Sequence, residues 1–307
     1  MPAIEDYALL GNLQTAALVS RAGSIDWCCF PRFDSSACFA AILGSAGNGR
    51  WLLAPSAEPV RVNRRYRHDT LILESVVETS AGSVRVIDFM PPGAAASELV
   101  RIVEGLSGEV EMLSELVIRF DFGSIVPWMQ TIGEDHVAIA GPDGLCYRAP
   151  VGARGEDMKT LSTFTVVAGE RVGFVLSWFP SHAPDPEPAD PEQALDDTEV
   201  FWHAWAAQCA HSGPYHEEVH QSLLVLKALT YASTGGMVAA PTTSLPESIG
   251  GSRNWDYRYC WLRDATLALL AMLRSGYRDE ATMWRQWLLR AVAGDPAAVQ
   301  IMYRNSG

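Results

Sequence analysis

The residue types best suited to chemistry gather in one short stretch, from Arg253 to Asp264. Aromatic residues occupy every second position, and charged residues stand between and after them: Trp255, Tyr257, Tyr259 and Trp261, with Asp256, Arg258, Arg263 and Asp264. Alternation by two predicts an extended segment with its rings on one side. Flat rings can pack on the C–H face of a sugar, while Arg and carboxylate groups replace water at its hydroxyls. The stretch is therefore a candidate carbohydrate site, although a buried strand with structural ion pairs has the same composition.

The pattern changes at Asp264, because residues 265–274 are rich in helix formers and contain no breaker. We expect a helix there, with Asp264 as its N-cap and Gly276 just past its end. The charged end of the stretch would then lie at a junction between an extended segment and a helix.

The order of these residues resembles the signature of glycoside hydrolase family 15, which contains glucoamylases, glucodextranases and bacterial trehalase-like enzymes. The resemblance is carried by residues 250–264 (GGSRNWDYRYCWLRD) and 240–247 (APTTSLPE), and near the start by residues 11–19 (GNLQTAALV) and 23–27 (GSIDW). The opening segments are similar to the N-terminal domain of the trehalase-like branch. Together these segments extend over almost the whole chain.

The resemblance implies roles for four residues. Arg263 and Asp264 match the pair that binds the terminal glucosyl unit at the bottom of the pocket. Trp261 matches an aromatic residue of the pocket wall. Tyr257 matches the tyrosine beside the reacting ring, where its electron-rich side would stabilise an oxocarbenium-like transition state.

The reaction implied by the resemblance is hydrolysis of α-linked glucosides, such as maltooligosaccharides or trehalose, with inversion. A general acid protonates the glycosidic oxygen and a general base activates water. In the family both carboxylates lie on loops of later barrel helices, so we expect them downstream of Gly307 and assign no catalytic residue here. Glu247 and Asp256 are nearby acids that match neither role. For Asp256 and Arg258, an ion-pair scaffold is the open alternative.

Residues 4 to about 180 predict a β domain. Short segments rich in β-branched and aromatic residues are separated by turn residues such as Gly23 and Gly82. This spacing is typical of antiparallel sheets packed face to face. We expect residues 168–170 to form a hairpin turn between the last two strands and residues 36–43 to form a short helix.

A helical part follows a compositional break. Residues 180–199 contain five prolines among acidic residues and no Lys or Arg, which indicates a semi-stiff, solvated linker. Helical stripes come next, at residues 192–211, 215–233 and 279–293. With the resemblance, the predicted fold class is a β-sandwich N-terminal domain followed by the first helices of an (α/α)6 barrel. The predicted domains are residues 1–182 (sandwich), 183–213 (linker and linker helix) and 214–307 (incomplete barrel).

An incomplete barrel has two consequences. We expect the chain to be a truncation or fragment that is inactive alone, with half of a substrate pocket. We also expect apolar side chains to be exposed where later helices would pack: Leu223, Leu267, Leu270 and Leu288.

Composition and net charge argue against some classes of binding partner. The 307 residues carry a formal net charge of −13, which argues against nucleic acid and anionic membranes. No apolar run is long enough to span a membrane, and the first residues do not resemble a secretion signal, so we expect a cytoplasmic protein. The six scattered cysteines form no Cys-x-x-Cys pair and are expected to be reduced and mostly buried. We expect no cofactor and an α-glucoside or oligosaccharide as partner. The sequence does not indicate an oligomeric state.

One motif suggests other chemistry. Residues 216–220 match His-Glu-x-x-His, in which His216 and His220 would bind zinc and Glu217 would act as a base. No histidine follows the match, although a downstream Glu could supply a third ligand. The match falls in the first turns of a helix after Pro214, and the stretch is similar to the opening barrel helix of the family, so we interpret it as a chance match without metal. A non-catalytic sugar-binding or interaction protein built on a β-sandwich is the main alternative function. A glucose-release assay distinguishes it from a hydrolase.

Overall fold

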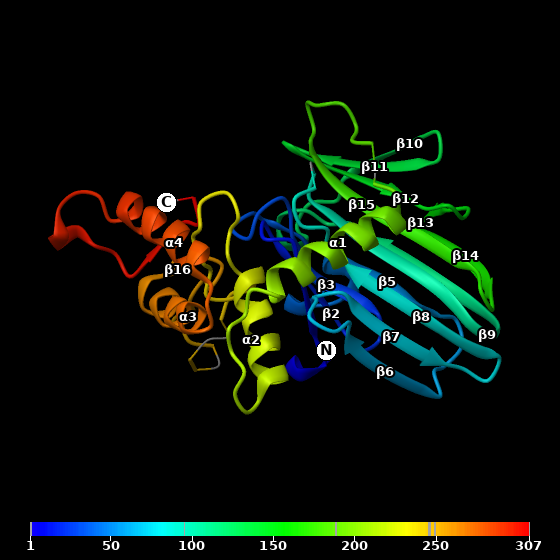
Figure 1. Cartoon of the computed structure of the whole chain (residues 1–307). Coiled ribbons are helices and arrows are strands. Elements are labelled where there is room, and N and C mark those ends of the chain that lie inside the picture. Colours follow the sequence, from blue (N-terminus) through cyan, green and yellow to red (C-terminus); the bar gives the residue numbers. More distant parts are fainter. Residues whose placement is uncertain (1, 95, 188, 245–246, 249, 307) are drawn as a thin grey trace.

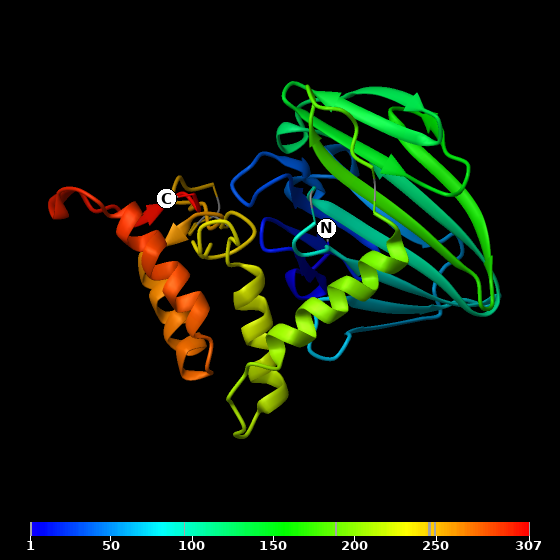
Figure 2. The same cartoon turned by 45° about the horizontal axis from the view of Figure 1, so that its top comes forward.

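The computed structural model describes residues 2–94, 96–187, 189–244, 247–248 and 250–306. Pro188 of the predicted linker, Leu245 and Pro246 of the family-like segment, and Gly307 lie outside this range. The strands β1–β15, which we call the β region, occupy one side of the molecule (Figures 1 and 2). Helix α1 lies along the β region, and helices α2, α3 and α4 stand beside it.

The β region contains fifteen of the strands in the described residues. Their bounds are β1 Ala8–Gly11, β2 Ala16–Val19, β3 Ser24–Cys29, β4 Ala37–Phe39, β5 Arg50–Pro55, β6 Arg61–Tyr66, β7 Leu73–Glu78, β8 Gly82–Phe89, β9 Glu98–Val117, β10 Trp128–Ile132, β11 Asp135–Ala140, β12 Asp143–Arg148, β13 Arg154–Glu156, β14 Lys159–Val167 and β15 Arg171–Pro180. Short 3-10 helices lie at Ile4–Asp6, Ala41–Leu43, Ala46–Asn48 and Asp121–Gly123. All pairings between these strands are antiparallel.

Strand β9 joins the two halves of the β region. Its first half pairs with β8 and β15, and its second half pairs with β5 and β14. Side chains from both halves meet in one large core, which includes Trp51, Met112, Tyr147 and Phe174. The prediction of a large antiparallel β domain is therefore confirmed.

The expected hairpin at residues 168–170 is wrong. Strands β14 and β15 do not pair with each other, because both pair along β9. Residues 168–170 instead lie against the middle of β9, where Gly169 donates to the Gly105 carbonyl oxygen at 2.9 Å and Ala168 donates to the Gly108 carbonyl oxygen at 3.3 Å. A Cβ on Gly105 would lie 2.0 Å from the Val167 carbonyl oxygen, so only glycine permits this approach. The turn signal was correct, but the turn links β14, which pairs with the second half of β9, to β15, which pairs with its first half.

The expected helix at residues 36–43 is also wrong. The chain forms strand β4 and then a single 3-10 turn, Ala41–Leu43. Cys38 and Phe39 are buried, and β4 pairs with β3. Pairing with the preceding strand β3 therefore overrides the local helical preference.

The helical part contains α1 Pro191–Ala206, α2 His216–Ala228, α3 Leu262–Arg274 and α4 Arg278–Ala291. Two short strands, β16 Cys260–Trp261 and β17 Met302–Tyr303, pair beside α3, and a 3-10 turn lies at Pro296–Ala298. Asp190 caps α1, since its carboxylate accepts hydrogen bonds from the Glu192 and Gln193 N–H groups at 3.0 and 2.9 Å. The fold is thus a large antiparallel sheet followed by a few helices, and the assignment of these helices to the start of an (α/α)6 barrel stays a prediction.

A buried carboxylate ties three of these helices together. Glu280 of α4 accepts hydrogen bonds from the Trp205 indole of α1 at 2.6 Å and from the Lys227 ammonium group of α2 at 3.0 Å. Burial by itself would raise the pKa of Glu280, but these two donors outweigh it, so the pKa lies below its usual value. Tyr277 stacks on Trp205 with ring centroids 4.1 Å apart.

The exposure predicted for apolar helix faces is right in part. Leu267 and Leu270 of α3 are 63% and 45% exposed. Leu223 is only 3% exposed, because α2 packs it into a core with α1 and α3, so its predicted exposure is wrong. Leu288 is half-buried.

Candidate functional site

Residues 253–264, the signature segment, are held between two neighbouring stretches. On one side the N–H groups of Ala239, Ala240 and Ser244 donate to carbonyl groups of the segment at 2.8–3.2 Å. On the other side β16 pairs with β17. The segment is a regular strand only at Cys260–Trp261, and a turn occupies residues 257–258. The expected single ladder of rings is therefore wrong, since the turn takes Tyr259 out of line with the other aromatics.

A pocket of about 380 Å³ opens against this segment, and we call it the signature pocket. It is lined by Ala239, Glu247, Trp255, Tyr257, Trp261, Arg263, Asp264 and Ile301. All four predicted site residues are among them, so the structure brings them together. Tyr259 does not line the pocket.

Three aromatic rings form one wall of the signature pocket. Trp261 meets Trp255 edge-on at 6.1 Å between ring centroids and Tyr257 at 5.7 Å. The Trp261 indole N–H also donates to the Asp256 carbonyl oxygen at 3.1 Å, which fixes the ring. Edge-on packing leaves ring faces free for the C–H groups of a ligand.

Arg263 and Asp264 lie in the first turn of α3. The Arg263 guanidinium donates to the Asp264 carboxylate at 3.3 Å, and the two side chains are 80% and 40% exposed. Asp264 is not the N-cap that we expected, because α3 begins at Leu262 and Trp261 holds the cap position without a side-chain hydrogen bond. An exposed ion pair of this kind adds little stability. Its polar groups are available to a ligand.

Arg258 and Asp256 form a scaffold behind the pocket. The Arg258 guanidinium donates to both carboxylate oxygens of Asp256, with contacts of 2.7 to 3.3 Å. It also donates to the Ser35 carbonyl oxygen at 2.7 Å and to Cys29 Sγ at 3.6 Å, and it lies over the Phe122 ring. The last three residues belong to the β region, so the pair fastens the signature segment to it.

The charge balance of this scaffold rests on Asp256. Burial alone would lower the pKa of Arg258, but the hydrogen bonds to Asp256 outweigh it and the pKa is raised. Burial raises the pKa of the Cys29 thiol to about 12, so that group is uncharged at neutral pH.

A second link between the β region and the stretch before the signature segment is made by Trp27, whose indole N–H donates to the Pro241 carbonyl oxygen at 2.8 Å.

Glu247 and Trp255 are pocket residues to which the sequence assigned no role. The Glu247 carboxylate accepts from the Trp255 indole at 3.3 Å and lies 3.5 Å from Arg253. The place of Trp255 in the aromatic alternation could have indicated its role. Ile301 enters from the segment before β17, and no sequence signal links it to the pocket.

The His-Glu-x-x-His match lies elsewhere. His216 and His220 have ring centroids 4.2 Å apart, but their Nδ1 atoms face the His211 carbonyl oxygen and the Asp69 carboxylate at 3.0 and 3.1 Å. Within the described ranges, no group of three or more His, Cys, Asp or Glu side chains is arranged to hold a metal ion. Among those same residues, no helix is long and apolar enough to cross a membrane. All six cysteines are free thiols, and only Cys209 is not buried.

Comparisons with known proteins agree with this geometry. Residues 1–154 match the family described as "Trehalase-like, N-terminal", and residues 213–307 match "Glycosyl hydrolases family 15". A trehalase of Mycolicibacterium smegmatis is 33% identical, with 100% of this chain and 50% of the relative covered. A trehalase of Thermoplasma volcanium is 31% identical, with 92% and 46% covered. The chain thus spans about half the length of the curated relatives it matches.

A solved structure shares the fold. A bacterial glucoamylase complexed with acarbose superposes with a TM-score of 0.70 at 12% identity, covering 98% of this chain and 52% of that one. The resemblance predicted from the residues is confirmed by the family matches. This chain thus belongs to the trehalase-like N-terminal family, and its residues 213–307, which carry the signature pocket, match glycosyl hydrolase family 15.

Proposed function

We propose that this chain supplies the N-terminal domain and part of the glucose-binding pocket of an inverting glycoside hydrolase. Its substrates would be α-linked glucosides, namely trehalose or maltooligosaccharides. The observation that carries the proposal is the grouping of Tyr257, Trp261, Arg263 and Asp264 around one pocket, in a chain whose relatives are trehalases.

Each pocket residue has a chemical role in the proposal. The Asp264 carboxylate accepts hydrogen bonds from two sugar hydroxyls, and Arg263 orients it and donates to a further oxygen. Trp261 and Tyr257 pack against the ring of the terminal glucosyl unit. Trp255, held by Glu247, extends this aromatic wall.

The catalytic acid and base are proposed to lie outside residues 1–307. Two carboxylates line the signature pocket, and both are engaged: Asp264 with Arg263, and Glu247 with Trp255 and Arg253. Neither is therefore assigned to proton transfer, so the 307-residue chain alone should not hydrolyse glucosides. We further propose a sandwich domain at residues 1–182, a linker at 183–213 and the start of a barrel domain at 214–307. A cytoplasmic location stays a prediction.

Binding and turnover test the proposal separately. Quenching of tryptophan fluorescence is measured with trehalose, with maltose and with lactose as the unrelated sugar. An Asp264→Asn variant should weaken glucoside binding ~10-fold or more, as expected for a lost charged hydrogen bond. Asp279→Asn is the matched control, because Asp279 is in the first turn of α4 and does not line the pocket.

The outcomes discriminate between the candidate functions. Equal binding by wild type and Asp264→Asn would refute the assignment of the pocket. Glucose release by the 307-residue chain would refute the absence of the acid and base. If a longer protein containing the full family region bound glucosides without cleaving them, the non-catalytic sugar-binding function would replace the hydrolase.

A further inference from the structure

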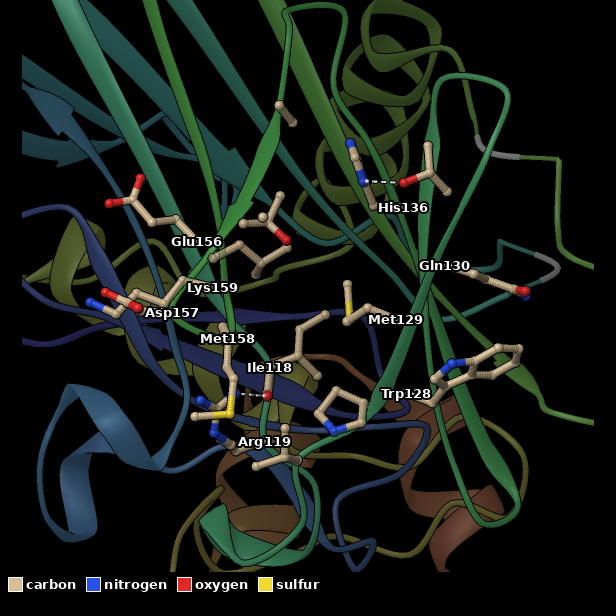
Figure 3. A pocket seen from close by; sticks show the side chains of 17 residues that line it. Ile118, Arg119, Trp128, Met129, Gln130, His136, Glu156, Asp157, Met158 and Lys159 are labelled. Atoms are coloured by element: carbon tan, nitrogen blue, oxygen red, sulfur yellow. Dashed lines mark hydrogen bonds between the residues drawn. The ribbon is translucent and has the colours of Figure 1, made fainter.

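A second cavity lies in the β region and shares no residue with the signature pocket. Its volume is about 530 Å³, which is within the ~300–1,000 Å³ common for small-molecule sites. Side chains from the hairpin of β10 and β11 face the turn between β13 and β14 across it (Figure 3). The end of β9 and the two residues after it, Ile118 and Arg119, form another wall.

Arg119 sets this cavity apart. It is one of three buried arginines among the described residues, with 8% exposure, and the others are Arg101 and Arg258. Arg101 and Arg258 each have a carboxylate partner, Asp88 at 2.7 Å and Asp256 at 2.7 Å. Arg119 forms no ion pair with any described residue.

The hydrogen bonds of Arg119 leave its charge uncompensated. One terminal nitrogen, Nη1, donates to the carbonyl oxygens of Ile118 and Met158 at 2.7 and 3.2 Å. Burial lowers the pKa of Arg119, and no neighbouring carboxylate opposes this effect. A guanidinium nevertheless stays protonated at neutral pH. A buried charge without a counter-charge is costly, so the position favours an anion beside it.

The acidic residues around the cavity do not supply that counter-charge. Glu115 pairs with Lys159 at 2.9 Å, and Glu156 pairs with Arg154 at 3.2 Å. Asp157 is exposed on the turn and forms no ion pair with Arg119. Lys159 also lines the cavity, with its charge paired to Glu115.

Part of the remaining wall is apolar and adaptable, while Gln130, Thr131 and His136 add polar groups to it. Ile118, Met129 and Met158 line the cavity, and Met158 is 70% exposed. Figure 3 shows Met129 and Met158 on opposite sides of it. Methionine side chains adjust to ligands of irregular shape. Val126 and Trp128 beside them are 50% and 67% exposed, so the mouth of the cavity is apolar as well.

We propose that this cavity binds a small organic anion, with its carboxylate paired to Arg119 and its apolar body against Ile118, Met129 and Met158. The site is independent of the signature pocket. Both observations are needed. The unpaired guanidinium favours a ligand with a negative charge, and the methionine-lined walls favour a ligand with an apolar body.

Octanoate and its neutral analogue octanamide test the proposal on the wild-type 307-residue chain. Titration calorimetry should show octanoate binding ~10-fold or more tightly than octanamide, since a charged hydrogen bond distinguishes them. Equal binding of the two, or binding of neither, would overturn the proposal without any variant.

Variants test whether Arg119 provides the positive charge that binds octanoate. Arg119→Gln should abolish the preference for octanoate, while Arg154→Gln, an exposed arginine on the neighbouring β13, should keep it. Should Arg119→Gln fail to fold by circular dichroism, Met158→Asp provides the test. Met158 is exposed and has φ +58°, which aspartate tolerates, so folding is preserved. The added carboxylate should weaken octanoate at least ~10-fold and leave octanamide nearly unchanged. An unchanged preference in either folded variant would refute the assignment to Arg119.

Discussion

Replacing Arg258 by methionine should destabilise the attachment of the signature segment to the β region. The variant keeps most of the apolar volume and removes the charge. It leaves Asp256 without its partner and the Ser35 carbonyl oxygen without its 2.7 Å donor. The Arg258 side chain is 8% exposed and that of Asp256 is 25% exposed.

These exposures set the expected magnitude. Breaking a buried ion pair from one side costs about 3–5 kcal/mol, because the remaining charge stays buried. Asp256 retains some contact with solvent, so we expect the lower end, about 3 kcal/mol of unfolding free energy. The pocket should also lose affinity, since the Asp256 carbonyl group holds the Trp261 indole.

Urea unfolding followed by fluorescence measures the free energy, and a glucoside titration measures the affinity. Arg274→Met is the control, because Arg274 is exposed in the last turn of α3. Adding Asp256→Asn to Arg258→Met should recover part of the loss, about 1–2 kcal/mol, by removing the stranded charge. A single-variant loss under about 1 kcal/mol, which is typical of a surface pair, would refute the scaffold role. A double variant whose loss of unfolding free energy equals the sum of the two single-variant losses would also refute it.

Three further experiments test other parts of the fold. The pKa of Glu280 is lowered in the folded protein, so its stabilising contribution is fully present above pH 4.5 and is lost as the pH falls through the folded pKa. The difference in unfolding free energy between wild type and Glu280→Gln, measured at several pH values, should therefore shrink in acid. A difference that stays constant with pH would contradict this. Gly105→Ala should cost about 2–3 kcal/mol by thermal unfolding, because its Cβ would overlap the Val167 carbonyl, whereas Gly152→Ala, with nothing within 4 Å, should cost little. Limited proteolysis should leave a stable fragment near residues 1–182, and its absence would argue against the proposed domain division.

The helices and the site could largely be predicted because their signals are local. Helices α3 and α4 end where the sequence places Gly276 and the Gly294 region, within a few residues. Tyr257, Trp261, Arg263 and Asp264 lie within eight successive residues, so almost any fold of that segment keeps them close. Their convergence on one pocket follows from this proximity. Their role in sugar binding stays a prediction.

The path of β9 could not be predicted, because its partners are far away in the sequence. Glycines at positions 105 and 108 are compatible with a break between two strands, but the structure has one 20-residue strand that runs through them. Glycine permits both outcomes. Pairing with β5, β8, β14 and β15 decides between them, and those segments start up to about 70 residues from it.

Charge pairing distinguishes Arg258 from Arg119, two of the three buried arginines, in a way that composition cannot. The chain has 36 acidic and 23 basic residues, so carboxylates outnumber the Lys and Arg side chains with which they could pair. Arg258 lies two residues from its carboxylate, but its contacts with Ser35 and Cys29, more than 220 residues away, show that it works as a scaffold. Arg119 has acidic neighbours as well, yet each nearby Glu is taken by another cation. The unpaired Arg119 guanidinium is therefore evidence for an anionic ligand, because a buried charge without a counter-charge is costly and carboxylates are abundant in this chain.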